Sequence, residues 1–244
     1  MAIRTKLRDR KLPNYTRGEE IFHMASHISG GGFAVAALLV CLAVASWQRN
    51  PWAVASAIVY GITMIALYAM SSIYHGLIPE HPKKIFQVMD HCAIFFLMAG
   101  TYTPIAMVSL RLVHPRIAWG LFIFLWGACL LGATLNAIDL RKFRIFSMIC
   151  YIGLGWSIVI FTRQLLEAIP FSAFILLLAG GILYTIGSVL YLMGKKRKYM
   201  HSVFHLFVVA GSVLHFVSIL ICIMDAGLDI FTKICYNNIV PFME

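Results

Sequence analysis

Histidines, a carboxylate and a serine occur at spacings that could build a metal-dependent hydrolytic site. Ser71 and His75 are four residues apart, as are His201 and His205, and Asp90 lies between the two pairs. Residues four apart share one face of a helix, about 6 Å along its axis. Three imidazoles from two helices suit Zn²⁺ with one position left open, as in catalytic zinc sites. Asp90 could then take a proton from water, and Ser71 could hydrogen-bond that water or a carbonyl.

The spacing alone leaves a second interpretation open. Nine histidines in a helical chain produce some pairs four apart by chance, and His23 and His27 form another such pair. The segment His201–His205 contains no glutamate, so the zincin HExxH motif is absent. Histidines hydrogen-bonded to backbone or loop groups near lipid headgroups would give the same pattern without a metal. His215 lies roughly 15 Å from His205 along a helix axis, too far to join the same site.

The composition indicates a polytopic membrane protein. Of 244 residues, 61% are hydrophobic and 12% are charged, whereas soluble domains average about 45–50% and about 25%. Seven windows of at least 18 residues lack Asp, Glu, Lys and Arg. Because backbone groups in lipid must be satisfied internally, such long runs must be helices. The sequence therefore predicts an all-α bundle of seven transmembrane helices and excludes a soluble domain, a disordered chain and an alternating β-barrel.

Short loops should join these helices into one compact bundle. The expected spans are 22–46, 53–76, 86–109, 116–137, 144–163, 170–193 and 200–224. They divide the chain into a basic cytoplasmic N-terminal segment (1–20), a transmembrane domain (21–226) and a short extracytoplasmic tail (227–244). Pro104 is expected to kink the third span. The glycines at 30–32 and 180–181 are expected to allow close approach of helices.

The charge distribution predicts the orientation. The net charge is +10, and 15 of the 20 lysines and arginines, among them the Lys195–Lys198 run, fall on one side of the expected spans. The positive-inside rule places that side, and the N-terminus, in the cytoplasm. It accounts for the basic charge without a nucleic-acid partner. The end of span 2 and the starts of spans 3 and 7 then share one membrane face, which brings Ser71–His75, Asp90 and His201–His205 to one depth. The short loops fit a multi-pass protein of a bacterial inner membrane.

Three stretches of the chain resemble the hemolysin III family, which is grouped with the progestin and adipoQ receptors and, more widely, with the alkaline ceramidases. These stretches are Ser71–His75, Met89–Pro104 with its DH and AGTYTP elements, and His201–His205. They occur in the family's order, and the resemblance extends from Glu19-Glu20 to span 7. It implies a seven-helix fold with a cytoplasmic N-terminus, in agreement with the charge distribution.

The resemblance also implies a site and three possible functions. It implies zinc held by His75, His201 and His205, with Ser71 and Asp90 contacting the zinc-bound water. One hypothesis is an intramembrane zinc hydrolase of a lipid amide or ester, as in the ceramidase and adiponectin-receptor branches. The others are a membrane-homeostasis sensor or lipid receptor with a structural zinc, and a pore-forming cytolysin. A fold hosts several functions, so the resemblance does not choose among them. Membrane lipid is the expected substrate or ligand, and the sequence leaves the oligomeric state open.

Overall fold

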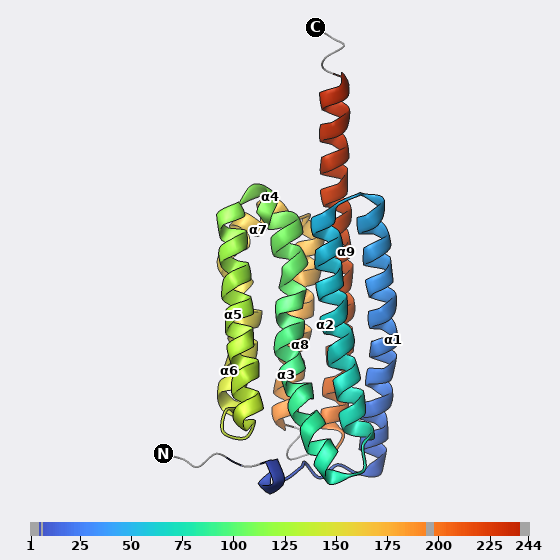
Figure 1. Ribbon diagram of the computed structural model, residues 1–244, viewed down its shortest axis with the longest axis vertical. Helices are drawn as coiled ribbons and strands as arrows, with labels where there is room; N and C mark the ends of the chain where they lie inside the picture. The colour runs from blue at the N-terminus through green and yellow to red at the C-terminus, as the bar shows by residue number, and fades with distance from the viewer. Residues whose placement is uncertain (1–4, 6, 194–197, 240–244) are drawn as a thin grey trace.

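The computed structural model describes residues 5, 7–193 and 198–239, and within these ranges it is helical and contains no strand. Figure 1 shows long helices standing side by side with short connections at both ends. The elements in chain order are η1 (Leu7–Asp9), α1 (Arg17–Trp47), α2 (Pro51–Gly76), α3 (Glu80–Pro104), η2 (Ile105–Leu110), α4 (Arg111–Val113), α5 (Pro115–Asp139), α6 (Arg144–Gly155), η3 (Ser157–Phe161), α7 (Thr162–Ala168), α8 (Phe171–Met193) and α9 (Met200–Ile239).

Seven stretches of the described residues are helical, long and apolar enough to cross a membrane, which confirms the predicted fold class. Five of them are the single helices α1, α2, α5, α8 and α9. The third span combines α3, η2 and α4, and the fifth combines α6, η3 and α7. The orientation of this bundle in the membrane stays a prediction, and residues 195–197 of the basic run lie outside the described residues.

Helix α1 begins at Arg17, five residues before the expected span, because its N-terminus is well capped. The Thr16 hydroxyl accepts a hydrogen bond from the Glu19 backbone N–H at 3.3 Å, and the Glu19 carboxylate accepts one from the Thr16 backbone N–H at 2.9 Å. This capping box satisfies two of the free N–H groups of the first turn. The early start extends the helix through Glu19 and Glu20, which places their carboxylates beside the histidines.

Helix α3 begins at Glu80, six residues before the expected span, although Lys83 and Lys84 follow closely. Both lysines are buried, and each ammonium group has a carboxylate partner: Lys83 pairs with Glu20 of α1 at 2.8 Å, and Lys84 with Glu80 at 2.6 Å. Burying a charge costs less when an opposite charge is paired with it, so the start of α3 can bury both lysines. Asp90, expected to open the span, therefore lies about 15 Å along α3 from its first residue.

The third span changes its helical geometry at Pro104, where the sequence predicts a disruption. Pro104 ends α3, and the six residues that follow form the π-helical segment η2, all of them buried. Proline has no backbone N–H to donate, and π-helical turns are one way in which a helix absorbs the missing bond. Nearby, the Tyr102 hydroxyl donates to the Gly155 carbonyl at 2.6 Å and ties this span to the end of α6.

Two of the glycines predicted to favour helix packing lie at close contacts. A Cβ atom on Gly30 would lie 2.5 Å from the Tyr68 ring of α2, and one on Gly180 would lie 2.2 Å from the His215 ring of α9. Gly32, in contrast, faces open space. Of the five glycines singled out from the sequence, Gly30 and Gly180 therefore hold neighbouring helices at a distance that a larger side chain would not permit.

The two ends of the bundle differ. At the end drawn lowest in Figure 1, the segment before α1 passes beneath the helices, and the Thr5 backbone N–H donates to the Asp139 carboxylate at 2.7 Å. At the opposite end, α9 runs past the expected span end at 224, continues to Ile239 and projects beyond the other helices. The start of α1, the end of α2 and the starts of α3 and α9 all lie at the lower end.

Candidate metal centre

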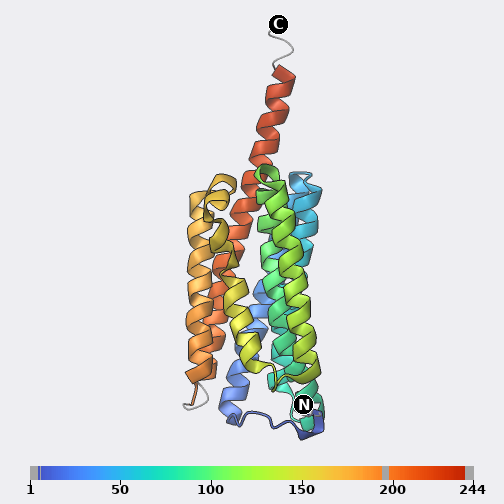
Figure 2. The same ribbon diagram turned by 90° about the vertical axis from the view of Figure 1, so that its left-hand side faces the viewer.

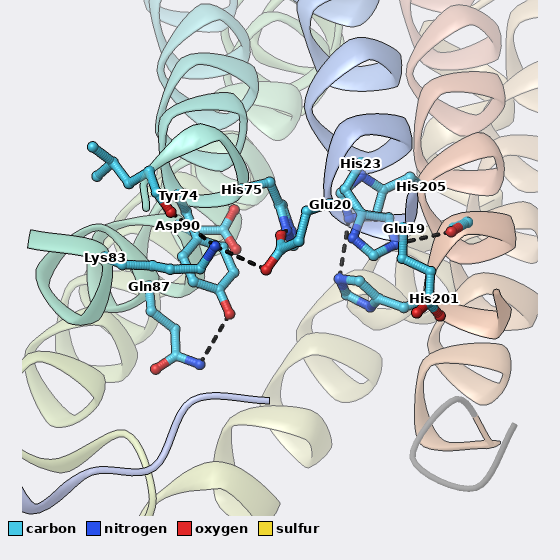
Figure 3. A network of polar contacts seen from close by, with 12 residues as sticks. Glu19, Glu20, His23, Tyr74, His75, Lys83, Gln87, Asp90, His201 and His205 are labelled. Atoms are coloured by element: carbon cyan, nitrogen blue, oxygen red, sulfur yellow. Dashed lines mark hydrogen bonds and ion pairs between the residues drawn. The ribbon is translucent and has the colours of Figure 1, made fainter. Parts of the chain in front are cut away.

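Four histidines from three helices meet near the lower end of the bundle. His75 of α2 and His201 and His205 of α9 come together as the sequence predicts, and His23 of α1 joins them. Each can offer one ring nitrogen such that all four nitrogens lie within 4.8 Å of one another. Figure 3 shows these side chains gathered where the three helices converge. The spacing of four residues in α9 places His201 and His205 on the same helix face.

The donor atoms of this cluster fit a divalent metal. The buried atoms His75 Nε2 and His23 Nδ1 have no hydrogen-bond partner, and such atoms are costly inside a protein unless something satisfies them. His201 Nε2 and His205 Nε2 lie 3.1 Å apart. Two nitrogens bound to one tetrahedral zinc at about 2.0–2.1 Å lie roughly 3.3–3.4 Å apart. The cluster could therefore close around an ion with little movement.

Polar groups outside the cluster fix the histidine rings. His75 Nδ1 lies 2.7 Å from the Glu20 carboxylate, whose other oxygen accepts from Lys83 at 2.8 Å, and Figure 3 shows Glu20 between these two side chains. This contact assigns the proton to Nδ1 and leaves the Nε2 lone pair free for a metal. Metal-binding histidines commonly donate their second N–H in this way, which orients the ring and raises its basicity. The sequence pattern alone does not indicate this position for Glu20.

Ser71 and Asp90 lie beside the cluster and contact each other. The Ser71 hydroxyl of α2, one turn before His75, lies near the Asp90 carboxylate of α3. Ser71 is 1% exposed, and the Asp90 side chain is 15% exposed. Both residues line the same cavity as His201 and His205. A carboxylate that faces a space next to the histidines is placed to accept a proton from a group bound there.

The cavity has a volume of about 200 Å³ and a mostly apolar lining. It extends from the histidines between α3, α6, α8 and α9 as far as His215. Along α6, only Ser147 is buried, so this helix forms a thin outer wall. Figure 2 shows α6 (yellow) diverging from α8 (orange) toward the lower end. The lining residues Tyr151 and Tyr191 on these helices are partly exposed, so the cavity reaches the seam between α6 and α8.

Tyr15, just before α1, covers the lower side of the cluster. Its ring stacks on His201 with a centroid separation of 5.0 Å and an interplanar angle of 11°, and it meets the edge of His23 at 5.0 Å. Burial raises the pKa of the Tyr15 phenol well above its usual value. The ring therefore caps the histidines as a neutral aromatic group.

Three other histidines stand apart from the four-residue group. His27 stacks on His205 with a centroid separation of 3.8 Å, but neither of its nitrogens has a partner. His91 Nδ1 donates to the Gln87 carbonyl at 2.8 Å. His215 Nε2 donates to the Leu177 carbonyl at 3.1 Å and lines the far part of the cavity, in agreement with its predicted separation.

Comparison with known proteins places this chain in a family. A family model described as "Haemolysin-III related" matches residues 15–216, a range that contains every residue of the cluster. The chain belongs to the hemolysin III family. It is 36% identical over 211 residues to "Hemolysin-3" of Bacillus cereus, covering 86% of this chain and 94% of that relative. Hemolysin III relatives in bacteria and seven apolar helices together identify a multi-pass membrane protein.

Other relatives of this hemolysin III protein occur in bacteria and in mammals. "Hemolysin-3 homolog" of Bacillus subtilis (strain 168) is 30% identical over 206 residues, which span 84% of this chain and 95% of the relative. "Monocyte to macrophage differentiation factor" of Homo sapiens is 23% identical over 178 residues, which span 69% of this chain and 70% of the relative.

Proposed function

We propose that this hemolysin III protein is a zinc-dependent hydrolase that cleaves an amide or ester of a membrane lipid. One observation carries the proposal: two histidines of the cluster, His201 and His205, line an apolar cavity inside a membrane bundle together with Ser71 and Asp90. Imidazole donors favour zinc over harder cations such as Mg²⁺ and Ca²⁺. We further propose that this end of the bundle faces the cytoplasm, as the basic residues indicate.

His75, His201 and His205 would hold the metal. A zinc ion in such a site acts as a Lewis acid and lowers the pKa of water to about 7. Asp90 would accept the proton of the attacking water and later donate it to the leaving amine or alkoxide. Ser71 would hold the Asp90 carboxylate by its hydrogen bond and could donate to the substrate carbonyl. Glu20 would keep His75 oriented.

The cavity would bind the acyl chain of the lipid. Its lining is mostly apolar, so an alkyl chain would displace little ordered water, and each buried CH₂ contributes about 0.8 kcal/mol. A chain lying there would present its carbonyl to the end of the cavity where Asp90 and the histidines lie. The position of the cavity at the seam between α6 and α8 would let a lipid enter from the side of the bundle.

The experiment is a product assay with paired serine variants. Purified zinc-loaded protein in lipid nanodiscs is incubated with fluorescent ceramides and phospholipid esters, and released fatty acid is measured. We expect turnover by the native protein, a loss of about 10²–10⁴-fold for Asp90→Asn at unchanged metal content, and a smaller loss for Ser71→Ala. Ser72→Ala is the matched control, because the Ser72 hydroxyl donates to the Tyr68 carbonyl of its own helix at 2.7 Å. Asp90→Asn turning over at the native rate would refute the proposed role of the carboxylate.

The same purified protein, added to dye-loaded liposomes, tests the cytolysin hypothesis, which the name of the Bacillus cereus relative supports. A hydrolase releases fatty acid and leaves a dye trapped inside liposomes. A pore former releases the dye without producing fatty acid. Dye release by the native protein and by Asp90→Asn alike, with no product formed, would replace the hydrolase proposal with pore formation.

A further inference from the structure

The fourth histidine of the cluster has no role in a three-histidine hydrolytic site. His23 is fully buried, and its ring centroid lies 4.5 Å from His75, 4.7 Å from His201 and 4.7 Å from His205. The separations among those three rings are similar or larger, from 4.7 to 5.5 Å. His23 is therefore as central to the cluster as the residues expected to bind the metal.

We propose that His23 is a fourth metal ligand, so that this chain holds its ion with four imidazoles and closes the site. The inference rests on the proposed function only in that both invoke a metal at this cluster. Zinc sites with four protein ligands are closed, whereas catalytic sites keep one position for water or substrate. His23 must then leave the metal before hydrolysis can take place, which makes it a restraint on the reaction.

The hydrogen bonding of His23 supports coordination. His23 Nε2 lies 2.9 Å from the Ser202 hydroxyl, while the buried Nδ1 has no partner. If Nε2–H donates to Ser202, the imidazole is the neutral tautomer whose Nδ1 lone pair is free. Glu20 likewise accepts a hydrogen bond from His75 Nδ1, which leaves the Nε2 lone pair of His75 free. In both cases one nitrogen is anchored and the other is left without a partner inside the cluster, which is the pattern of a metal ligand with its outer hydrogen bond.

His27 provides the contrast within the same helix. It lies one turn after His23, is buried to a similar extent and stacks on His205. Both of its nitrogens lack partners, so no hydrogen bond fixes its tautomer or its ring. It also lies outside the group whose nitrogens are within 4.8 Å of one another. His27 lines the adjacent cavity and stays outside the four-histidine group, whereas the anchored ring of His23 requires a partner for Nδ1.

The test counts ligands on a cobalt-substituted protein. Purified protein is loaded with Co²⁺ alone, and X-ray absorption spectroscopy counts the imidazoles bound to it. Azide is then added, because a small anion binds where a ligand position is open and changes the visible absorption of Co²⁺. Native protein, His23→Asn and His27→Asn are compared. Cobalt affinity is measured in parallel by competition with a chelator.

We expect four imidazoles and no azide response for the native protein and for His27→Asn. For His23→Asn we expect three imidazoles and an azide-induced spectral change. We also expect cobalt affinity to fall by more than about tenfold, the smallest loss typical of changes to groups that only hydrogen-bond to a ligand. Three imidazoles and an azide response in the native protein would overturn the proposal, and that measurement does not depend on how any variant folds. If His23→Asn binds metal with an open position but hydrolyses no lipid, the hydrolase proposal fails while the assignment of His23 stands.

Discussion

The carboxylate of Glu20 offers a sharp test of how the metal centre is built. Glu20→Gln replaces the charged acceptor of His75 Nδ1 at 2.7 Å and the partner of Lys83 at 2.8 Å with a neutral amide of the same shape. His75 would lose the partner that orients its ring and raises the basicity of Nε2. Loss of such outer contacts typically lowers metal affinity about 10–100-fold, which corresponds to roughly 1.4–2.8 kcal/mol. Chelator competition followed by metal analysis measures this change directly.

Glu19→Gln is the matched control for this variant. Glu19 is the neighbouring carboxylate in the same helical turn, but it accepts from the backbone N–H groups of Thr16 at 2.9 Å and Tyr199 at 2.8 Å. The change should lower the unfolding temperature through a weaker helix cap and leave metal affinity within about twofold, since capping changes cost about 0.5–2 kcal/mol of stability. Equal metal affinity in the two variants would refute the claim that Glu20 supports the site through His75.

Two further comparisons use paired positions. His205→Ala should strongly reduce metal binding by removing a ligand, whereas His215→Ala should leave metal content unchanged because that ring contacts the backbone of α8 instead; equal loss in both would mean that the wrong histidines are assigned. Gly30→Ala should lower stability in detergent by about 1–3 kcal/mol, because its Cβ would lie 2.5 Å from Tyr68. Gly32→Ala faces open space and should be neutral or slightly stabilising, so matching unfolding temperatures for the two glycine variants would contradict the packing described.

The seven-helix fold was predictable because hydropathy and charge set it directly. Lipid permits few backbone solutions, so long windows without charge had to become helices. Helix α3 begins before the expected span and contains Lys83 and Lys84, which pair with Glu20 and Glu80. The pair of Lys83 and Glu20 joins residues that are far apart in the sequence, and hydropathy does not report it.

The metal centre was predictable in part. The pairs Ser71 and His75, and His201 and His205, lie on helix faces that spacing alone defines, and the expected topology brings them to one end of the bundle. To place His23 in the site, one must know the rotation of α1 about its axis relative to α2 and α9. The close contact of Gly30 with Tyr68 helps to set this rotation. His23 and His27 are also four residues apart, but that spacing gave no reason to prefer either residue as a ligand.

Metal content of the detergent-purified protein tests the central claim most directly. Mass spectrometry would compare the native chain with the variant in which His75, His201 and His205 are all alanine. The account predicts one zinc ion per native chain and none in the variant, with both proteins folded by circular dichroism. Native protein that stays free of metal after incubation with excess zinc, or a variant that keeps it, would contradict the assignment of this cluster as a metal centre.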